Sequence, residues 1–169
     1  MSEGLKKTSE RVRVSFCLEP IDDNDRGSEK FPFAVAGEFL TGSERYVVRN
    51  TDGSRTFASL LVGEQPNNTF GKVLDIVGED IVGTTSFTLD TEGTPTILST
   101  RTESGLRKTG LAKRRIQLID QICRERLGKG VQSSQVRSPD GDKFWEHLVS
   151  EGVAQEIVLP EGKKRYSLL

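Results

Sequence analysis

The stretch SGLRKTGLAKRRIQLIDQICRERLGKG, residues 104–130, decides how the rest of the chain can fold. Its apolar residues recur at the three- and four-residue spacing of one helix face, namely Leu111, Ala112, Ile116, Leu118, Ile119, Ile122, Cys123 and Leu127. Basic residues are assigned to the other face, namely Lys113, Arg114, Arg115, Arg124 and Arg126. Gly128 follows the last apolar residue, where glycine readily ends a helix. The pattern predicts an amphipathic helix over 109–127 that packs on a core.

The start of this helix has the chemistry of an anion-binding turn. A helix N-terminus leaves backbone N–H groups unpaired, and its dipole favours negative charge. Gly110 has no side chain to block a ligand, and Arg107 and Lys108 add positive charge at the same end. The turn is therefore predicted to bind phosphate or pyrophosphate, although it is not a Walker loop. The alternative is a basic turn that binds no ligand.

Charge is distributed unevenly along the chain. The 169 residues have a net charge of −1, yet residues 101–130 contain nine Lys or Arg against three Asp or Glu. A basic segment in an otherwise acidic protein indicates an anionic partner, for which a phosphorylated cofactor and nucleic acid are both candidates. The alternative is a solvated helix face, or one that contacts acidic neighbours in an assembly.

The remaining pattern predicts strands before the helix and a helix with a hairpin after it. Alternation of apolar and polar residues, together with turn-forming Gly, Asp, Asn and Pro, indicates strands at 11–18, 45–49, 56–62, 72–77, 81–89 and 95–102. Residues 31–40 fit a strand or a short helix. After the central helix come a strand at 131–135, a helix at 139–151 capped by Ser138, and a hairpin of 153–159 and 164–168. The crossover through the helix requires 131–135 to lie parallel to 95–102.

These elements predict one α/β (α+β) domain over residues 1–169, with a mixed, mostly antiparallel twisted sheet and residues 1–10 as a polar tail. No apolar run is long enough to span a bilayer, and the N-terminus lacks an apolar signal core, so we expect a cytoplasmic protein. Cys17 and Cys123 are expected to be buried free thiols. One His and two Cys provide no metal cluster, so no metal is expected.

The turn also carries a resemblance. Its residues Arg107-Lys108-Thr109-Gly110-Leu111-Ala112 resemble the Arg/Gln-x-x-Gly-x-Gly/Ala signature of the GNAT superfamily of N-acetyltransferases. Later stretches are similar to small acetyltransferase-like proteins commonly encoded by bacteriophages, namely 133–134, 138–145 and 162–166. The resemblance covers roughly residues 95–169. It implies a GNAT-like fold, acetyl-CoA as co-substrate without a metal, and transfer of an acyl group to the amine of a small molecule or protein.

The resemblance also implies roles for particular residues. The amides of residues 107–112 would hold the pyrophosphate, and the backbone of Thr100 and Thr102 would pair with the pantetheine arm as an added strand would. An amine would attack the thioester directly, while a carboxylate takes its proton and a hydroxyl reprotonates the leaving thiolate. The chosen catalytic pair is Glu38 and Ser134; Asp75 and Glu103 are further carboxylates, each with an exposed, inert side chain as the alternative.

Two other functions stay open. The first is a non-catalytic protein of the same fold in a bacteriophage, with a virion, structural or host-interaction role and virion or homo-oligomeric partners; its place would then be the host cytoplasm or the virion. The second is a nucleic-acid binder that uses residues 139–151 as a recognition helix and 153–168 as a wing. The acidic character of 139–151 disfavours it.

Overall fold

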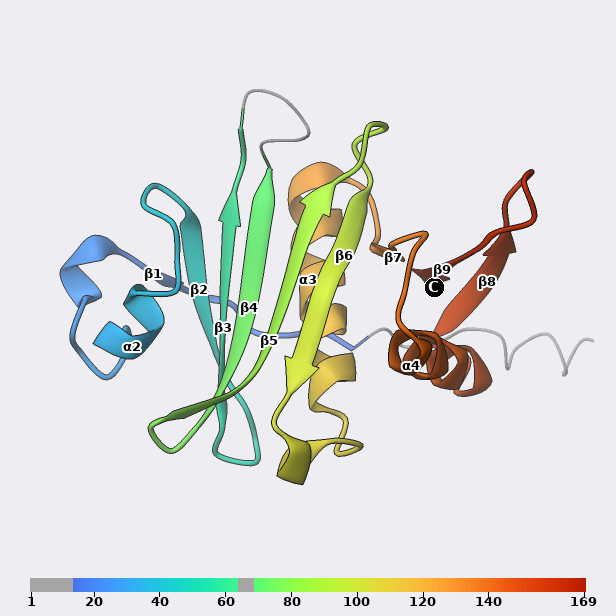
Figure 1. The fold of residues 1–169 in the computed structure, drawn as a ribbon. Coiled ribbons are helices and arrows are strands. Elements are labelled where there is room, and N and C mark those ends of the chain that lie inside the picture. Colours follow the sequence, from blue (N-terminus) through green and yellow to red (C-terminus); the bar gives the residue numbers. More distant parts are fainter. Residues whose placement is uncertain (1–13, 64–68) are drawn as a thin grey trace, which may run out of the picture.

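The computed structural model describes residues 14–63 and 69–169, and within them one sheet of nine strands in the order β1-β2-β3-β4-β5-β6-β7-β9-β8. Figure 1 shows this sheet with the long helix α3 (Leu111–Leu127) running along one face. All neighbouring strands are antiparallel except β6 and β7. The predicted mixed, mostly antiparallel sheet is therefore confirmed.

Strands β2 to β6 form an antiparallel meander, as the turn residues between them predict. Their bounds are Glu44–Arg49, Arg55–Leu61, Phe70–Val77, Asp80–Leu89 and Pro95–Thr102. The β2–β3 turn is closed by Asn50 and Ser54, with Gly53 at φ 87°, a left-handed conformation that suits glycine. The predicted break at 65–68 lies outside the described residues.

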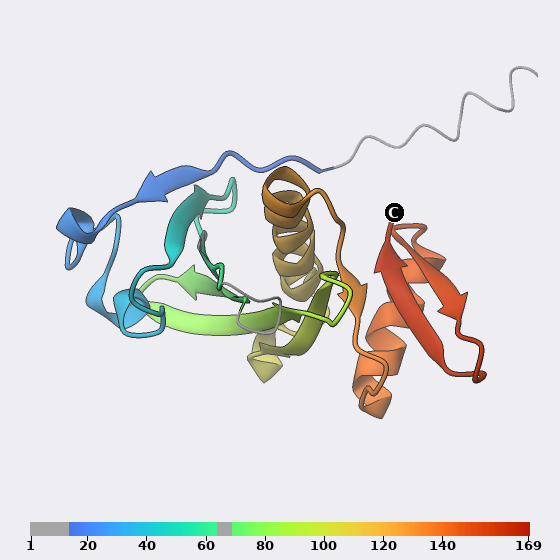
Figure 2. The same cartoon turned by 90° about the horizontal axis from the view of Figure 1, so that it is seen from above.

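The main core lies between the sheet and α3 (Figure 2). Val73 and Phe87 from the sheet pack there with Ile116, Ile119 and Cys123 of the helix, all of them buried. Burial raises the pKa of the Cys123 thiol to about 12, and the charge of Asp120 adds to the effect, so this cysteine is an inert core residue. The predicted apolar face of the central helix is confirmed.

A smaller core lies on the other face of the sheet. Alternate residues of a strand point to opposite faces, so Leu74 lies on the face opposite Val73, where it packs with Phe31 and Val35. Val35 belongs to α2 (Phe33–Ala36), which fulfils the prediction of a strand or short helix at 31–40. The sheet contributes Ile21, Val47, Phe57, Leu74 and Ile76 to this smaller core.

The predicted strand at 11–18 is wrong for its described part. Residues 14–18 form no strand, and residues 11–13 lie outside the described range. Strand β1 (Glu19–Ile21) follows instead, next to the 3₁₀ turn η2 (Asp23–Asp25). Phe16 is held by Gln121 of α3 rather than by a neighbouring strand. Cys17 on this segment is exposed, which corrects its prediction as a buried thiol, while both cysteines are free as expected.

The C-terminal part extends the sheet beyond α3. Strand β7 (Gln132–Ser133) is followed by α4 (Pro139–Ser150) and the hairpin of β8 (Ala154–Val158) and β9 (Lys164–Leu168). Ser138 caps α4 by accepting the Gly141 N–H at 3.1 Å, as predicted. Trp145 of α4 stacks on Tyr166 of β9, so both aromatic residues belong to the core. Because β9 pairs with β7, the hairpin continues the sheet and does not stand apart as a wing.

Candidate functional site: an opened strand edge beside a helix N-terminus

Strands β6 and β7 are paired over only two positions. Thr96 faces Gln132 and Ile97 faces Ser133, in the predicted parallel sense. At the next residue, Leu98, the pairing between β5 and β6 also shifts by one position, so Leu98 has the place of a bulge. Beyond it, β6 continues to Thr102 with β5 on one side, and none of the described strands pairs with its other side. The sheet therefore opens at this point.

The open side of β6 presents backbone groups of Thr100 and Thr102. Glu103 donates its N–H to Val82 of β5, and backbone groups alternate in direction along a strand, so Arg101 also faces β5. Thr100 and Thr102 lie at the intervening positions, and their N–H and C=O groups point to the open side. The Thr102 carbonyl accepts a hydrogen bond from Arg107 Nε at 3.3 Å. An extended ligand could add to this edge as a strand does.

Helix α3 begins beside this edge with an open N-terminus. Gly110 is its N-cap at φ 89°, with no side-chain cap. For the N–H groups of residues 108–113, the described part of the chain offers no hydrogen-bond partner. A side chain at Gly110 would meet only open space, and residues 107–110 are exposed. The corner predicted to hold a pyrophosphate is thus not blocked by its surroundings, and its unpaired amides fit an anion.

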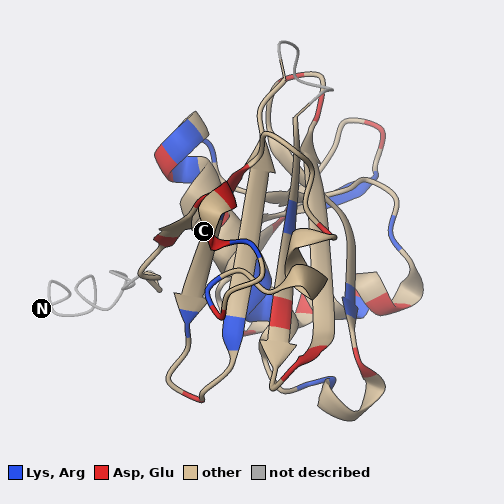
Figure 3. Ribbon diagram, turned by 90° about the vertical axis from the view of Figure 1, so that its left-hand side faces the viewer, with Lys and Arg blue, Asp and Glu red and all other residues tan. Residues whose placement is uncertain are grey.

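The basic residues near α3 fall into two groups. Five of them are paired with carboxylates, namely Lys113, Arg114, Arg115, Arg124 and Arg126. Within the described residues, Arg101, Arg107 and Lys108 have no carboxylate partner, and these three flank the start of the helix. Lys129, at the other end of α3, also has none there, but it donates to the Glu92 carbonyl. Figure 3 shows basic and acidic segments intermixed over the ribbon. The available positive charge lies at the open N-terminus.

Arg115 overturns the prediction that it lies on the solvated face of the helix. Its side chain is 0% exposed and forms an ion pair of 2.7 Å with Asp75, which is also 0% exposed. The remaining guanidinium N–H groups donate to Thr85 at 2.9 Å, the Arg101 carbonyl at 2.8 Å and Thr102 Oγ1 at 2.7 Å. Asp75, which the sequence offered as a further candidate carboxylate with an exposed side chain as the alternative, is instead buried and accepts further bonds from Thr56 and Arg114.

This buried pair connects the helix to the strand end at the opening. Burial lowers the pKa of the Arg115 guanidinium, while its hydrogen bond and charge interaction with Asp75 act in the opposite direction. Space for the guanidinium depends on Gly83, where an added Cβ would lie 2.2 Å from Arg115 Nη1. Arg115 thus fixes the end of β6 from the face covered by α3. The signal was present in the sequence, because position 115 falls on the apolar stripe between Leu111 and Leu118.

The predicted cofactor-binding residues come together at the opening, whereas the predicted catalytic pair does not meet there. Thr100, Thr102 and the turn 107–112, which comprises Arg107, Lys108, Thr109, Gly110, Leu111 and Ala112, border one corner. Leu111 is buried, and its backbone alone is available. Thr109 donates its hydroxyl to the Leu106 carbonyl, and the Thr100 and Thr102 hydroxyls bind Arg115, so only backbone groups of these threonines face the opening.

The predicted catalytic residues lie at two separate places. Ser134 follows the last paired residue of β7, and its hydroxyl donates to the Val136 carbonyl at 2.6 Å. Glu38 follows α2 and forms an ion pair of 3.2 Å with Lys72 of β4. Strand β5 separates β4 from β6, which corresponds to about 10 Å at the usual strand spacing. A proton from a group at β6 would reach Glu38 only through water.

Comparisons with known proteins return structural likenesses alone. No protein-family model and no curated protein matches the chain. A GNAT-family acetyltransferase from Staphylococcus aureus Mu50 superposes with a TM-score of 0.46 and 18% identity, over 59% of this chain and 68% of that one. A Bacillus anthracis protein provisionally described as a streptothricin acetyltransferase, solved with acetyl coenzyme A, superposes with a TM-score of 0.47 and 14% identity, over 92% of this chain and 98% of that one.

These likenesses are distant, and no activity is inferred from them. The similarity to bacteriophage proteins stays a prediction. Across residues 14–63 and 69–169, no helix is both long and apolar enough to cross a membrane. The same ranges contain no group of three or more His, Cys, Asp or Glu side chains placed to hold a metal ion.

Proposed function

We propose that the protein binds acetyl-CoA at the opening between β6 and β7 and transfers the acetyl group to an amine. The observation that carries the proposal is the adjacency of two hydrogen-bonding surfaces that no described strand or helix pairs with, although Arg107 donates to the Thr102 carbonyl. One is the free edge of β6 at Thr100 and Thr102, and the other is the set of amides at residues 108–113. An extended, amide-bearing arm that ends in a diphosphate matches both surfaces, since the first suits amides and the second suits anions.

In this proposal each part of the corner has a defined role. The amides around Gly110 hold the diphosphate, with Arg107 and Lys108 supplying charge, and the edge of β6 orients the arm. The coenzyme supplies the thioester carbonyl that the amine attacks, so that a C–N bond forms as the C–S bond breaks. Ser134, directly after the point where the strands part, is the proposed donor of a proton to the departing sulfur. Glu38 is the proposed acceptor of the amine proton, through intervening water.

A second candidate is a protein of the same fold that binds the coenzyme without turnover. The placement of the catalytic pair favours it, because Glu38 is engaged by Lys72 away from β6 and the Ser134 hydroxyl is committed to a carbonyl. A structural or host-interaction role would be compatible with such a protein. The amine acceptor and any assembly partner of either candidate are open to experiment.

Titration calorimetry with coenzyme A tests the shared part of both candidates. We expect binding to the native protein and at least about tenfold weaker binding to Gly110→Ala, because alanine at φ 89° is strained and moves the amides. Gly42→Ala is the matched control, since Gly42 has φ 86° and equally open surroundings in the turn before β2. Equal loss in both variants would contradict the site. Release of free thiol from acetyl-CoA with added amines then separates the transferase from the non-catalytic binder.

A further inference from the structure

A groove of about 400 Å³ lies on the β9 side of the segment that follows β7. Three elements line it: the segment Gln135–Arg137, the inner side of α4 at Asp142 and Glu146, and β9 with the turn before it. The volume falls in the range of small-molecule sites. The groove is distinct from the corner at Gly110, and none of its lining residues is among those proposed to hold the coenzyme.

Arg137 contacts all three elements that line the groove. Its side chain lies over the Tyr166 ring with the guanidinium carbon 4.9 Å from the ring centroid. Its guanidinium donates to the Ser134 carbonyl at 2.6 Å, the Lys164 carbonyl at 3.0 Å and Asp142 at 2.7 Å. These bonds connect the segment after β7 with β9 and with α4. The side chain is 11% exposed, and its charge is matched by Asp142, so this pair forms a neutral, rigid floor.

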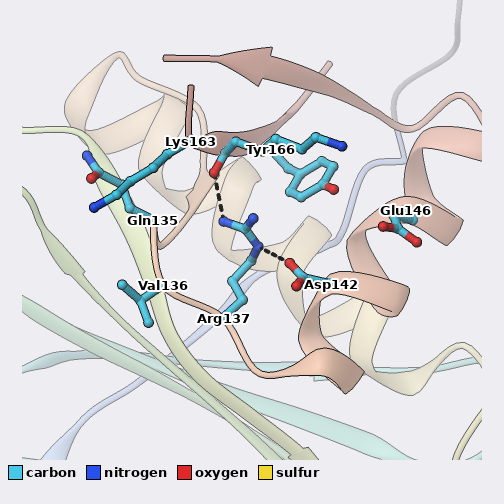
Figure 4. Close-up of a pocket in the computed structure, with 8 residues that line it drawn as sticks. Gln135, Val136, Arg137, Asp142, Glu146, Lys163 and Tyr166 are labelled. Carbon is cyan, nitrogen blue, oxygen red and sulfur yellow. Dashed lines mark hydrogen bonds and ion pairs between the residues drawn. The ribbon is translucent and has the colours of Figure 1, made fainter. Parts of the chain in front are cut away.

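Two charged side chains in the groove remain unmatched. Among the described residues, neither Glu146 nor Lys163 has an ion-pair or hydrogen-bond partner. Figure 4 shows them on opposite sides, with Arg137 and Tyr166 between them. The groove therefore presents a carboxylate on one side, which suits a positively charged ligand group, and an ammonium on the other, which suits a negatively charged one.

A rigidly held tyrosine supplies a hydrogen-bond donor to the groove. Tyr166 is only 1% exposed and its ring is fixed against Trp145, with centroids 6.0 Å apart. No described group of the chain forms a hydrogen bond with its hydroxyl, which lies at the groove surface, where it can donate to a ligand. Burial raises the pKa of Tyr166, and the charge of Glu146 adds to this, so the phenol stays protonated and can donate. Val136, 81% exposed, adds an apolar surface at the rim.

We propose that this groove binds a small molecule that carries both an ammonium and a carboxylate group, with Glu146 receiving the ammonium, Lys163 the carboxylate and Tyr166 donating a hydrogen bond. A zwitterion satisfies both free charges at once, whereas a singly charged ligand leaves one of them without a partner. An amino acid with an apolar side chain would also cover Val136. The site is independent of the coenzyme, and its test contains none.

The test uses three matched probes: L-phenylalanine, 2-phenylethylamine without the carboxylate, and 3-phenylpropanoate without the ammonium. Calorimetry is expected to show binding of L-phenylalanine and at least about tenfold weaker binding of each of the others, since each loses a charge-assisted contact. Backbone amide shifts should concentrate at residues 135–137. Equal binding of the three probes, no L-phenylalanine binding at millimolar concentration, or shifts elsewhere would overturn the proposal.

Two variants assign the contacts. Glu146→Gln should weaken L-phenylalanine about tenfold and leave 3-phenylpropanoate unchanged, because only the first probe carries an ammonium. Tyr166→Phe keeps the stacked ring and should weaken L-phenylalanine by a smaller factor, with thermal unfolding as the check on its fold. Glu79→Gln in the β4–β5 turn, an exposed residue of the same type, is the control and should change nothing. Equal effects of Glu146→Gln and Glu79→Gln would contradict the assignment.

Discussion

Arg115 and Lys108 lie seven residues apart around the start of α3, and they are used in opposite ways. Arg115 is fully buried, and its guanidinium is bonded to Asp75 and to groups of β5 and β6. Lys108 is exposed at φ 64° and has no carboxylate partner among the described residues. Arg115 holds the end of β6 in place, and Lys108 is available to a ligand at the helix N-terminus. Total charge in a segment therefore says little about which charges are available to a ligand.

The largest expected effect comes from the buried member of this comparison. Asp75→Asn removes the only carboxylate paired with the Arg115 guanidinium in the described structure and leaves a buried, uncompensated cation. We expect the free energy of unfolding to fall by about 3–5 kcal/mol, as is usual when one partner of a buried pair is lost. The Asp52 carboxylate also pairs with α3 but is 55% exposed, so Asp52→Asn should lower the free energy of unfolding by less than about 1 kcal/mol. Urea unfolding of both variants measures the two losses of stability. Similar midpoints would contradict the expected difference between the buried and the exposed carboxylate.

Substitution of Lys108, the exposed residue of the comparison, should weaken ligand binding and leave the free energy of unfolding nearly unchanged. Lys108→Glu places negative charge beside the open amides, so we expect coenzyme A affinity to fall about tenfold, and the difference to shrink at high salt. Lys129→Glu makes the same charge change at the other end of α3, where Lys129 donates to the Glu92 carbonyl. Calorimetry should show near-native affinity for that control. If the two variants bind equally weakly, the overall charge and not the helix N-terminus governs binding.

A smaller effect is expected for a carboxylate engaged in the turn between β5 and β6. Burial tends to raise the pKa of Asp90, but hydrogen bonds from the Thr94 and Glu92 amides and from Gln132 outweigh it, so the pKa lies below the ordinary 3.8. A lowered pKa in the folded state contributes stability above the ordinary value, and that stability is lost as pH falls through the folded-state value.

Asp90→Asn should therefore be less stable than the native protein at neutral pH, and the gap should narrow below about pH 4. Glu79→Gln is the comparison, because Glu79 is exposed in a turn. The measurement is the midpoint of urea unfolding at several pH values. A difference in midpoint between the two proteins that stays constant down to pH 2 would show that the charge of Asp90 does not contribute to stability.

The same contrast explains what the sequence could predict. Alternation and turn residues locate β2 to β6, and helical spacing locates α3 and α4, because these features depend on local pattern and burial. The parallel pairing of β7 with β6 follows from the crossover through α3. The prediction of a strand at 11–18 failed because an alternating pattern shows which side chains are buried, and not which element of the fold covers them. Here the partner of Phe16 is Gln121 of α3.

The candidate site was predictable where it depends on the backbone. Gly110 and the helix start follow from the sequence, as does the order of strands that places Thr100 and Thr102 beside them. Arg115 was misassigned because its charge outweighed its position on the apolar stripe, and the paired Asp75 lies 40 residues earlier. The groove at Tyr166 brings together residues from three elements, and its unpaired hydroxyl is visible only once those elements are packed.

The most direct test of the central claim is to follow backbone amide resonances of the native protein while coenzyme A is added. If the free amides of α3 and the open edge of β6 form one binding surface, the largest shifts will occur at residues 108–112 together with Thr100 and Thr102. Residues of β2 and β3, on the far side of the sheet order, should shift little. Shifts that are absent, or that spare residues 108–112, would contradict the account.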